Sequence, residues 1–350
     1  MNIKKNIAVL MGGPSAEHEV SLNTGRMIVA ALDPKKYRVT PVTITKEGKW
    51  VFPKAKRFTL GRAFDTLKAL KIDTVFVAMH GPFGEDGTIQ GLLDCAGIPY
   101  TGSGVLASAL AMDKAKAYEL FVARGLRVPK HIVVSKKEWG VKKGADVLRH
   151  AVRAAGIPAV VKPVGLGSSV GVSIVKEERD LKKAIAAAFR HGPTVLVDEY
   201  VKGVEVTCGV LDEGSGEKPM ALPVTEIIPV RSTFFDYKAK YTKGECEELT
   251  PARISPQLTK RVQAVALAAH GILGCSGMSR ADMIIKRLTT NDERLMTDDQ
   301  NGKIYLLEVN TIPGMTETSL LPQAAQAAGI PFPKLLDRII RAALAKGKDA

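Results

Sequence analysis

The chain has 350 residues, 45% of them hydrophobic and 25% charged, a composition typical of a globular protein with a large core and two or three domains. No apolar run approaches the roughly 18 residues that a membrane span needs, and the four cysteines form no CxxC pair, which predicts free thiols in a reducing cytoplasm. The net charge of +14 is compatible with nucleic-acid binding, but the lysines are widely spread and aromatic residues make up only 5% of the chain, so most lysines are expected to be solvated.

Residues 6 to about 112 alternate between strands and helices. Apolar or β-branched runs predict strands at Ile7–Met11, Val39–Thr45 and Thr74–Met79, and helical patterns fall at Val20–Leu32 and Thr88–Ala96. This alternation predicts a small parallel α/β unit, in which ligands collect at the carboxyl ends of the strands. Glycine-rich segments follow two of these strands, at residues 12–19 and 80–87.

Two further units are expected, which gives predicted domains at residues 1–112, 113–197 and 198–350. The second unit is predicted to hold a helix, a strand and a helix at Lys114–Arg124, His131–Val134 and Ala145–Ala155, followed by strand, glycine-rich loop, strand, helix and strand. The third is predicted to hold long strands at Val204–Leu211 and Met220–Val230, a helix at Pro256–Leu273, and terminal helices from about Ser319 and Lys334.

Two short strands of the third unit, at residues 279–285 and 304–310, carry polar side chains on one face. Because side chains alternate along a strand, that face carries Arg280, Asp282, Glu308 and Asn310. The opposite face is expected to pack on the core and carries Ala281, Met283, Leu307 and Val309. If the strands pair antiparallel, two carboxylates and an amide oxygen meet, a donor set that suits a hard divalent cation such as Mg²⁺. The alternative is an Arg280–Asp282 salt bridge with an unrelated acidic pair nearby.

The second unit contains a glycine-rich loop in the segment VVKPVGLGSSVGVS at residues 160–173, with a lysine, three glycines and two serines within residues 162–171. Glycines allow close backbone approach, so this loop can present N–H groups and the hydroxyls of Ser168 and Ser169 to a phosphate, with Lys162 adding positive charge. It lacks the GxxxxGK[ST] pattern and does not open a helix as GxGxxG does. A plain hairpin turn is the alternative interpretation.

Two more segments fit a nucleotide or a substrate. The apolar run at Val195–Glu205 ends in acids and can hold an adenine through its backbone and a ribose through a carboxylate, although such acids are often simply exposed. The basic and aromatic patch Phe234–Tyr241 fits either nucleic acid or a loop that clamps a substrate, with a lysine for phosphate or carboxylate and a phenol for hydrogen bonding.

Six motifs together resemble one known family. They are GGPSAEHEVS at residues 12–21, HGPFGEDG at 80–87, GSSVG at 167–171, YKAKY at 237–241, RAD at 280–282 and EVNTIPGM at 308–315. In this order they make the chain, from about residue 5 to 345, similar to the D-alanine–D-alanine ligases of the ATP-grasp superfamily.

The resemblance implies an α/β fold of three domains, with ATP between the second and third. It implies ligation of two D-alanine molecules through an acyl phosphate, as a step in peptidoglycan precursor synthesis. The implied cofactors are ATP and Mg²⁺ or Mn²⁺, with two ions per site. The implied assembly is a cytoplasmic homodimer formed through the first domain, with no nucleic-acid or membrane partner.

The resemblance also assigns roles residue by residue. The implied metal ligands are Asp282, Glu308 and Asn310. The implied ATP contacts are Lys114, Lys162, Ser169, Tyr200, Val201, Glu205 and Lys240. Glu17 is implied to hold the ammonium of the first D-alanine, linked to the hydroxyls of Ser168 and Tyr241. Arg280 and the N–H of Gly314 are implied to stabilise the oxyanion. The helix start at Ser319 and Leu320 is implied to bind the carboxylate of the second D-alanine.

Some alternatives stay open at this stage. His80 is either close to the first substrate or a structural turn histidine. Residues 231–250 are expected to form a mobile lid that excludes water. The chain departs from the family pattern at Leu166 and in the long polar segment Arg287–Gly302, which is expected to protrude. Ligation to D-lactate or D-serine is the main functional alternative, and Tyr241 argues for an amine acceptor. Another ATP-grasp carboxylate ligase and a basic nucleic-acid-binding protein are the remaining hypotheses.

Overall fold

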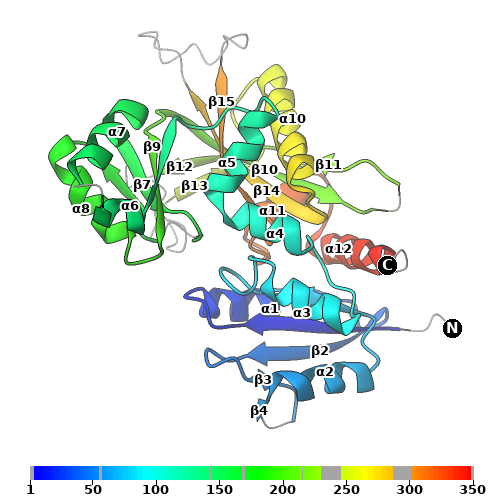
Figure 1. Cartoon of the computed structure of the whole chain (residues 1–350). Coiled ribbons are helices and arrows are strands. Elements are labelled where there is room, and N and C mark those ends of the chain that lie inside the picture. The colour runs from blue at the N-terminus through cyan, green and yellow to red at the C-terminus, as the bar shows by residue number, and fades with distance from the viewer. Residues whose placement is uncertain are drawn as a thin grey trace.

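A computed structural model describes residues 4–54, 57–141, 144–167, 170–214, 216–229, 246–286 and 302–347. Within these residues the chain forms three β-sheets flanked by helices, which confirms the α/β class (Figure 1). No helix in this described part is both long enough and apolar enough to cross a membrane.

The first sheet has five strands in the order β4-β3-β2-β1-β5. Strand β1 lies between β2 and β5 and is parallel to both, as predicted, while β3 and β4 extend the edge as an antiparallel pair. The elements of this unit are β1 (Lys5–Gly12), α1 (His18–Ala31), β2 (Tyr37–Ile44), β3 (Trp50–Val51), β4 (Arg57–Phe58), α2 (Leu60–Ala69), β5 (Thr74–Val77) and α3 (Thr88–Ala96). Since β1 and β5 are adjacent and parallel, the loops that follow them lie side by side.

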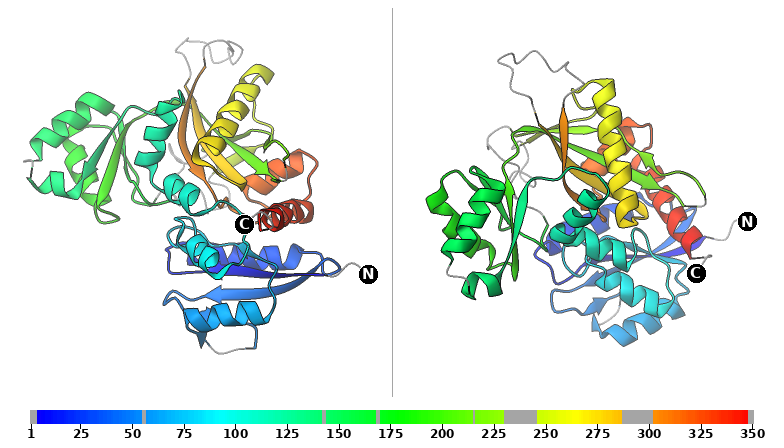
Figure 2. Two further views of the ribbon diagram at one scale, coloured as in Figure 1. Left: turned by 45° about the vertical axis from the view of Figure 1, so that its right-hand side comes forward. Right: turned by 45° about the horizontal axis from the view of Figure 1, so that its top comes forward.

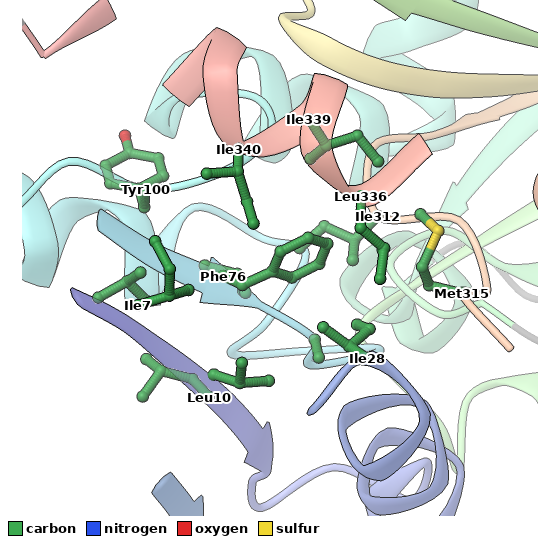
Figure 3. Close-up of a cluster of buried hydrophobic side chains, with 14 of the residues drawn as sticks. Ile7, Leu10, Ile28, Phe76, Tyr100, Ile312, Met315, Leu336, Ile339 and Ile340 are labelled. Atoms are coloured by element: carbon green, nitrogen blue, oxygen red, sulfur yellow. The ribbon is translucent and has the colours of Figure 1, made fainter. Parts of the chain in front are cut away.

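The core of this first unit includes the last helix of the chain. Helix α12 (Phe332–Lys346) packs Leu336, Ile339 and Ile340 into one buried cluster with side chains of β1 and β5 (Figure 3). Pro331 is the N-cap residue of this helix, and Pro333 lies in its first turn. A proline there removes no helical hydrogen bond, because the N–H groups of the first turn have no partner within the helix.

The second sheet is antiparallel, with four strands in the order β6-β9-β7-β8. Its elements are β6 (His131–Ser135), α6 (Lys136–Val141), α7 (Ala145–Ala155), β7 (Ala159–Pro163), β8 (Ser173–Val175), α8 (Glu178–Ala188) and β9 (Thr194–Glu199). The predicted glycine-rich loop therefore connects β7 to β8. Helices α7 and α8 pack together with the sheet in a separate buried cluster.

The third sheet has six strands, five of them in the order β13-β12-β10-β14-β15, with β11 pairing on β10. Its elements are β10 (Gly203–Asp212), β11 (Met220–Ala221), β12 (Thr225–Pro229), β13 (Cys246–Leu249), α10 (Pro256–Leu273), β14 (Gly277–Lys286), β15 (Lys303–Asn310) and α11 (Leu320–Ala327). The prediction of one long strand at Met220–Val230 is wrong, because the chain forms two short strands separated by residues 222–224. Pro223 in this break has no N–H to donate to a sheet.

Helices α4 (Val105–Met112) and α5 (Lys114–Ala123) join the first sheet to the other two. The α5 side chains Tyr118 and Phe121 share a buried cluster with α10 and the third sheet, so α5 packs there although it precedes the second sheet in sequence (Figure 2). The predicted domain boundaries at 112/113 and 197/198 remain a prediction.

Candidate active site

Strands β14 and β15 pair antiparallel, as the alternation of their side chains predicted. Arg280 lies opposite Asn310, and Asp282 lies opposite Glu308. The predicted polar face therefore exists, and it brings two carboxylates and an amide together at the edge of a cleft. Among the described residues no three His, Cys, Asp or Glu side chains gather as a metal group, so a metal here depends on the amide of Asn310 beside the two acids.

Asp282 is held in place by hydrogen bonds from three side chains. Arg280 donates from Nε and a terminal nitrogen at 2.9 and 2.8 Å, and Asn310 donates from Nδ2 at 3.1 Å. Thr207 Oγ1, on the neighbouring strand β10, lies 2.6 Å from Asp282 Oδ1. The Arg280–Asp282 salt bridge of the alternative interpretation is thus present, and metal binding by this face stays a prediction. Thr207 was missed by the sequence analysis, although it lies directly opposite Asp282 in the sheet.

A β-bulge changes which side chains of β15 face the cleft. The register shifts after Asp282, so Met283 pairs with Leu306 instead of Leu307. The expectation that Leu307 packs on the core is wrong: Leu306 is fully buried there, and Leu307 lines the cleft. An extra residue in one strand turns the following side chains to the other face, and alternation alone does not reveal it.

A cavity of about 450 Å³ opens between the second and third sheets. Its lining includes the residues predicted for a nucleotide, namely Lys114, Lys162, Tyr200, Val201, Glu205, Asp282 and Glu308. Apolar side chains complete a slot beside them, among them Val160, Ile284 and Leu307. A cavity of this size that combines apolar and charged side chains is typical of a site for a small molecule such as a nucleotide.

Two of the three predicted phosphate lysines, Lys114 and Lys162, are buried, and each contacts an acid. Lys114 Nζ lies 3.0 Å from Glu308 Oε2 and donates to the carbonyl of Leu166 in the glycine-rich loop at 2.8 Å. Lys162 Nζ lies 2.7 Å from Asp198 Oδ2 and donates to the hydroxyl of Tyr118 at 3.1 Å.

Asp198 and Tyr118 were missed as site residues. The phenol of Tyr118 also donates to Asp198, at 3.3 Å, and burial raises its pKa, so it stays protonated. Asp198 lies near the end of the buried strand β9, which pairs with β7, the strand that carries Lys162. An acid in this apolar run was the only signal in the sequence.

A second cavity, of about 530 Å³, lies between the first and third sheets. It is lined by the predicted residues Glu17, His80, Arg280, Glu308, Asn310, Gly314, Ser319 and Leu320. Glu308 lines both cavities. A group that reacts with a nucleotide phosphate can therefore be held beside it.

Glu17 and His80 follow the adjacent parallel strands β1 and β5, and both are buried. Gly81 has φ of +73°, and a Cβ there would lie 2.5 Å from Glu17 Oε2, so glycine is required for this approach. His80 Nε2 lies 3.0 Å from Thr24 Oγ1, and its Nδ1 lies 3.6 Å from Glu85 Oε1. Burial raises the pKa of Glu85, and its contact with His80 opposes that rise. His80 thus lines the cavity and also fixes the turn.

The far side of this cavity is the start of helix α11, where Ser319 is the N-cap residue. Ser319 Oγ accepts a hydrogen bond from the N–H of Thr316 at 3.1 Å. A Cβ at Gly314 would lie 3.0 Å from that hydroxyl oxygen, so the lack of a side chain keeps the backbone close to the helix start. Free N–H groups at a helix start attract anions.

Four predicted residues, Ser168, Ser169, Lys240 and Tyr241, lie outside the described residues, as do most of the predicted lid and of the segment 287–302. Gly167, which adjoins Ser168, lines the second cavity. The roles assigned to these four side chains stay predictions.

Comparison with known proteins decides the family. The sequence profile described as "D-ala D-ala ligase C-terminus" matches residues 120–341, and the profile described as "D-ala D-ala ligase N-terminus" matches residues 6–63 and 53–103. The chain belongs to the D-alanine–D-alanine ligase family. Its fold is accordingly the ATP-grasp ligase fold.

Relatives of similar length match the chain from end to end. It is 43% identical to the D-alanine–D-alanine ligase of Syntrophobacter fumaroxidans, over 97% of this chain and 98% of that protein. It is 41% identical to the D-alanine–D-alanine ligase of Leptospira interrogans, again over 97% and 98%.

Solved structures are also similar. VanG D-Ala:D-Ser ligase from Enterococcus faecalis has a TM-score of 0.82 and 33% identity, covering 97% of this chain and 100% of that one. The D-alanine–D-alanine ligase of Bacillus anthracis complexed with ATP has a TM-score of 0.76 and 34% identity, covering 99% of each.

Proposed function

We propose that this protein joins two D-alanine molecules into D-alanyl-D-alanine, converting ATP to ADP and phosphate through an acyl-phosphate intermediate, for peptidoglycan precursor synthesis. The observation that carries the proposal is the pair of cavities that meet at Glu308. One has the residues for ATP, and the other has charged groups for two amino acids, so a carboxylate and a γ-phosphate can be brought together. The family relationship and the full-length relatives support the same reaction.

The first cavity would hold ATP. The adenine would lie in the apolar slot at Tyr200 and Val201, with Glu205 on the ribose, while Lys114 and Lys162 exchange their acidic partners for phosphate oxygens. Asp282, Glu308 and Asn310 would supply the hard oxygen donors that Mg²⁺ or Mn²⁺ prefers, and the proposal includes two ions held by these residues. When bound, such ions neutralise phosphate charge during transfer.

The second cavity would hold the two amino acids. Glu17 pairs with the ammonium of the first D-alanine, which keeps this amine protonated and unreactive. After phosphorylation of its carboxylate, the amine of the second D-alanine attacks the carbonyl carbon, the C–N bond forms, and phosphate leaves. Arg280 and the N–H of Gly314 stabilise the oxyanion of that step. The N–H groups at Ser319 and Leu320 bind the carboxylate of the second D-alanine.

Ser168, Ser169, Lys240 and Tyr241 complete the proposal. Ser169 and Lys240 would contact the phosphates, and the hydroxyls of Ser168 and Tyr241 would connect to Glu17. Closure of residues 231–250 over the cavities protects the acyl phosphate from water. His80 supports the first substrate.

Assembly and location follow the same reasoning. We place the protein in the cytoplasm as a homodimer formed through the first domain, with domains at 1–112, 113–197 and 198–350. The four cysteines are all free, which supports a reducing compartment.

An assay of ADP release with D-alanine against L-alanine, with the product identified by mass spectrometry, tests the function. We expect D-alanine-dependent release and D-alanyl-D-alanine as product. ATP hydrolysis that is independent of D-alanine, or turnover of the L form, would refute it. Offering D-serine and D-lactate as acceptors tests the alternative that the similarity to a D-Ala:D-Ser ligase raises.

A further inference from the structure

One carboxylate in the second cavity has no role in the reaction as described so far. Glu248 lies on β13 and lines the cavity together with Arg280, Ser319 and Leu320. Its neighbour on the same strand, Glu247, is exposed. A half-buried acid that faces a substrate cavity is costly unless a cation or a donor offsets it.

A glutamine on α11 fixes the position of this acid. Gln323 Nε2 donates to Glu248 Oε2 at 2.8 Å and to the carbonyl of Thr318 at 2.6 Å. Because Gln323 lies in the first turn of α11, these bonds hold the carboxylate beside the helix start. Among the described residues the hydrogen bond from Gln323 engages Oε2, which leaves Oε1 for a ligand in the cavity that Glu248 lines.

This arrangement puts a negative group beside an anion-binding helix start, the layout that a zwitterion needs. We propose that Glu248 binds the ammonium of the second D-alanine while the N–H groups at Ser319 and Leu320 bind its carboxylate. Glu248 then accepts one proton from this ammonium, and the neutral amine that results attacks the acyl phosphate. Glu248 thereby selects an amine acceptor over a hydroxy acid such as D-lactate, which has a neutral hydroxyl in place of the ammonium. This inference rests on the proposed function.

Burial supports the assignment energetically. It raises the pKa of Glu248, since the charged form is poorly solvated, while the bond from Gln323 and the positive field of Arg280 oppose that rise. A carboxylate in this position gains more from an arriving cation than an exposed one does. The residue is a specificity determinant, because its partner is the acceptor and not the reacting phosphate.

The test is the substitution Glu248→Gln, which keeps the shape and removes the charge, with Glu247→Gln as the matched control on the same strand. D-alanine and D-lactate compete as acceptors with D-alanine as donor, and mass spectrometry separates the dipeptide from the depsipeptide. We expect Glu248→Gln to raise the half-saturating concentration of D-alanine as acceptor roughly 10- to 100-fold, the loss of one charge-assisted hydrogen bond. The dipeptide-to-depsipeptide ratio should fall, whereas Glu247→Gln should change neither quantity.

The outcomes separate the two proposals. If the unsubstituted protein forms no dipeptide, the proposed function fails, and the role of Glu248 fails with it. If it forms dipeptide and Glu248→Gln leaves acceptor saturation unchanged, only the role of Glu248 fails. An equal rise in the half-saturating concentrations of ATP and of the acceptor would also overturn the role of Glu248. That pattern indicates a general effect on the fold or on Arg280.

Discussion

The hydroxyl of Thr207 is predicted to tune the proposed metal site without touching the metal. Thr207→Val keeps the shape of the side chain and removes the hydroxyl that lies 2.6 Å from Asp282 Oδ1. Both residues are buried, at 3% and 8% exposure, so water does not easily replace the lost bond.

The size of the expected loss in Mg²⁺ affinity depends on the hydrogen bonds that Asp282 keeps after Thr207→Val. A hydrogen bond to a charged group contributes about 1.5–3 kcal/mol. Asp282 keeps two bonds from Arg280 and one from Asn310, which still fix its orientation. We therefore expect a loss of about 1–2 kcal/mol, which corresponds to a roughly 5- to 30-fold higher half-saturating Mg²⁺ concentration.

The assay is ADP release at saturating ATP and D-alanine across a Mg²⁺ titration. Thr225→Val is the matched control, since Thr225 lies opposite Thr207 in the sheet, is fully buried, and bonds Thr250 Oγ1 at 2.6 Å. Equal Mg²⁺ dependence of Thr207→Val and the unsubstituted protein would refute the reasoning. A shift of the same size in Thr225→Val would do so as well.

Three further predictions follow from the site and the core. Glu17→Ala should raise the half-saturating concentration of the first D-alanine about 10- to 100-fold by removing its counter-charge, with ATP saturation nearly unchanged in the same ADP-release assay; a selective loss of ATP affinity would contradict this. Asp198→Asn should lower the free energy of unfolding in urea by about 3 kcal/mol, because it leaves Lys162 buried without its partner; an unchanged midpoint would count against that pair. Burial raises the pKa of Cys208 to about 12, so the thiol stays protonated at pH 8. Iodoacetamide should therefore label the exposed Cys95 and not Cys208 in the native protein. Alkylated Cys208 in peptide mass spectrometry would contradict this prediction.

Much of the fold was predictable because its patterns are local. The parallel strands of the first unit, the helix at Pro256–Leu273 and the antiparallel pair that carries Asp282 depend on periodicity that neighbouring residues share. The break at Pro223 was not predicted, although a proline that has no N–H for a sheet is a local signal for it. The bulge at Leu307 was not predicted because it depends on how β15 pairs with β14.

The site shows the same division. Residues within motifs, such as Glu17 and Glu308, carry their chemistry in the sequence, and the structure places them on one pair of adjoining cavities. Thr207 and Glu248 belong to no sequence motif, so the sequence analysis did not identify them. The structure shows that Thr207 lies opposite Asp282 in the sheet and that Glu248 lines the second cavity.

The packing of α12 on the first sheet has a consequence for biosynthesis. Strands β1 and β5 find part of their apolar cover in Leu336 and Ile340, residues that a ribosome adds long after it has made the first sheet. A nascent chain that ends before residue 332 therefore exposes that surface, so the first sheet completes its burial only after α12 has been translated.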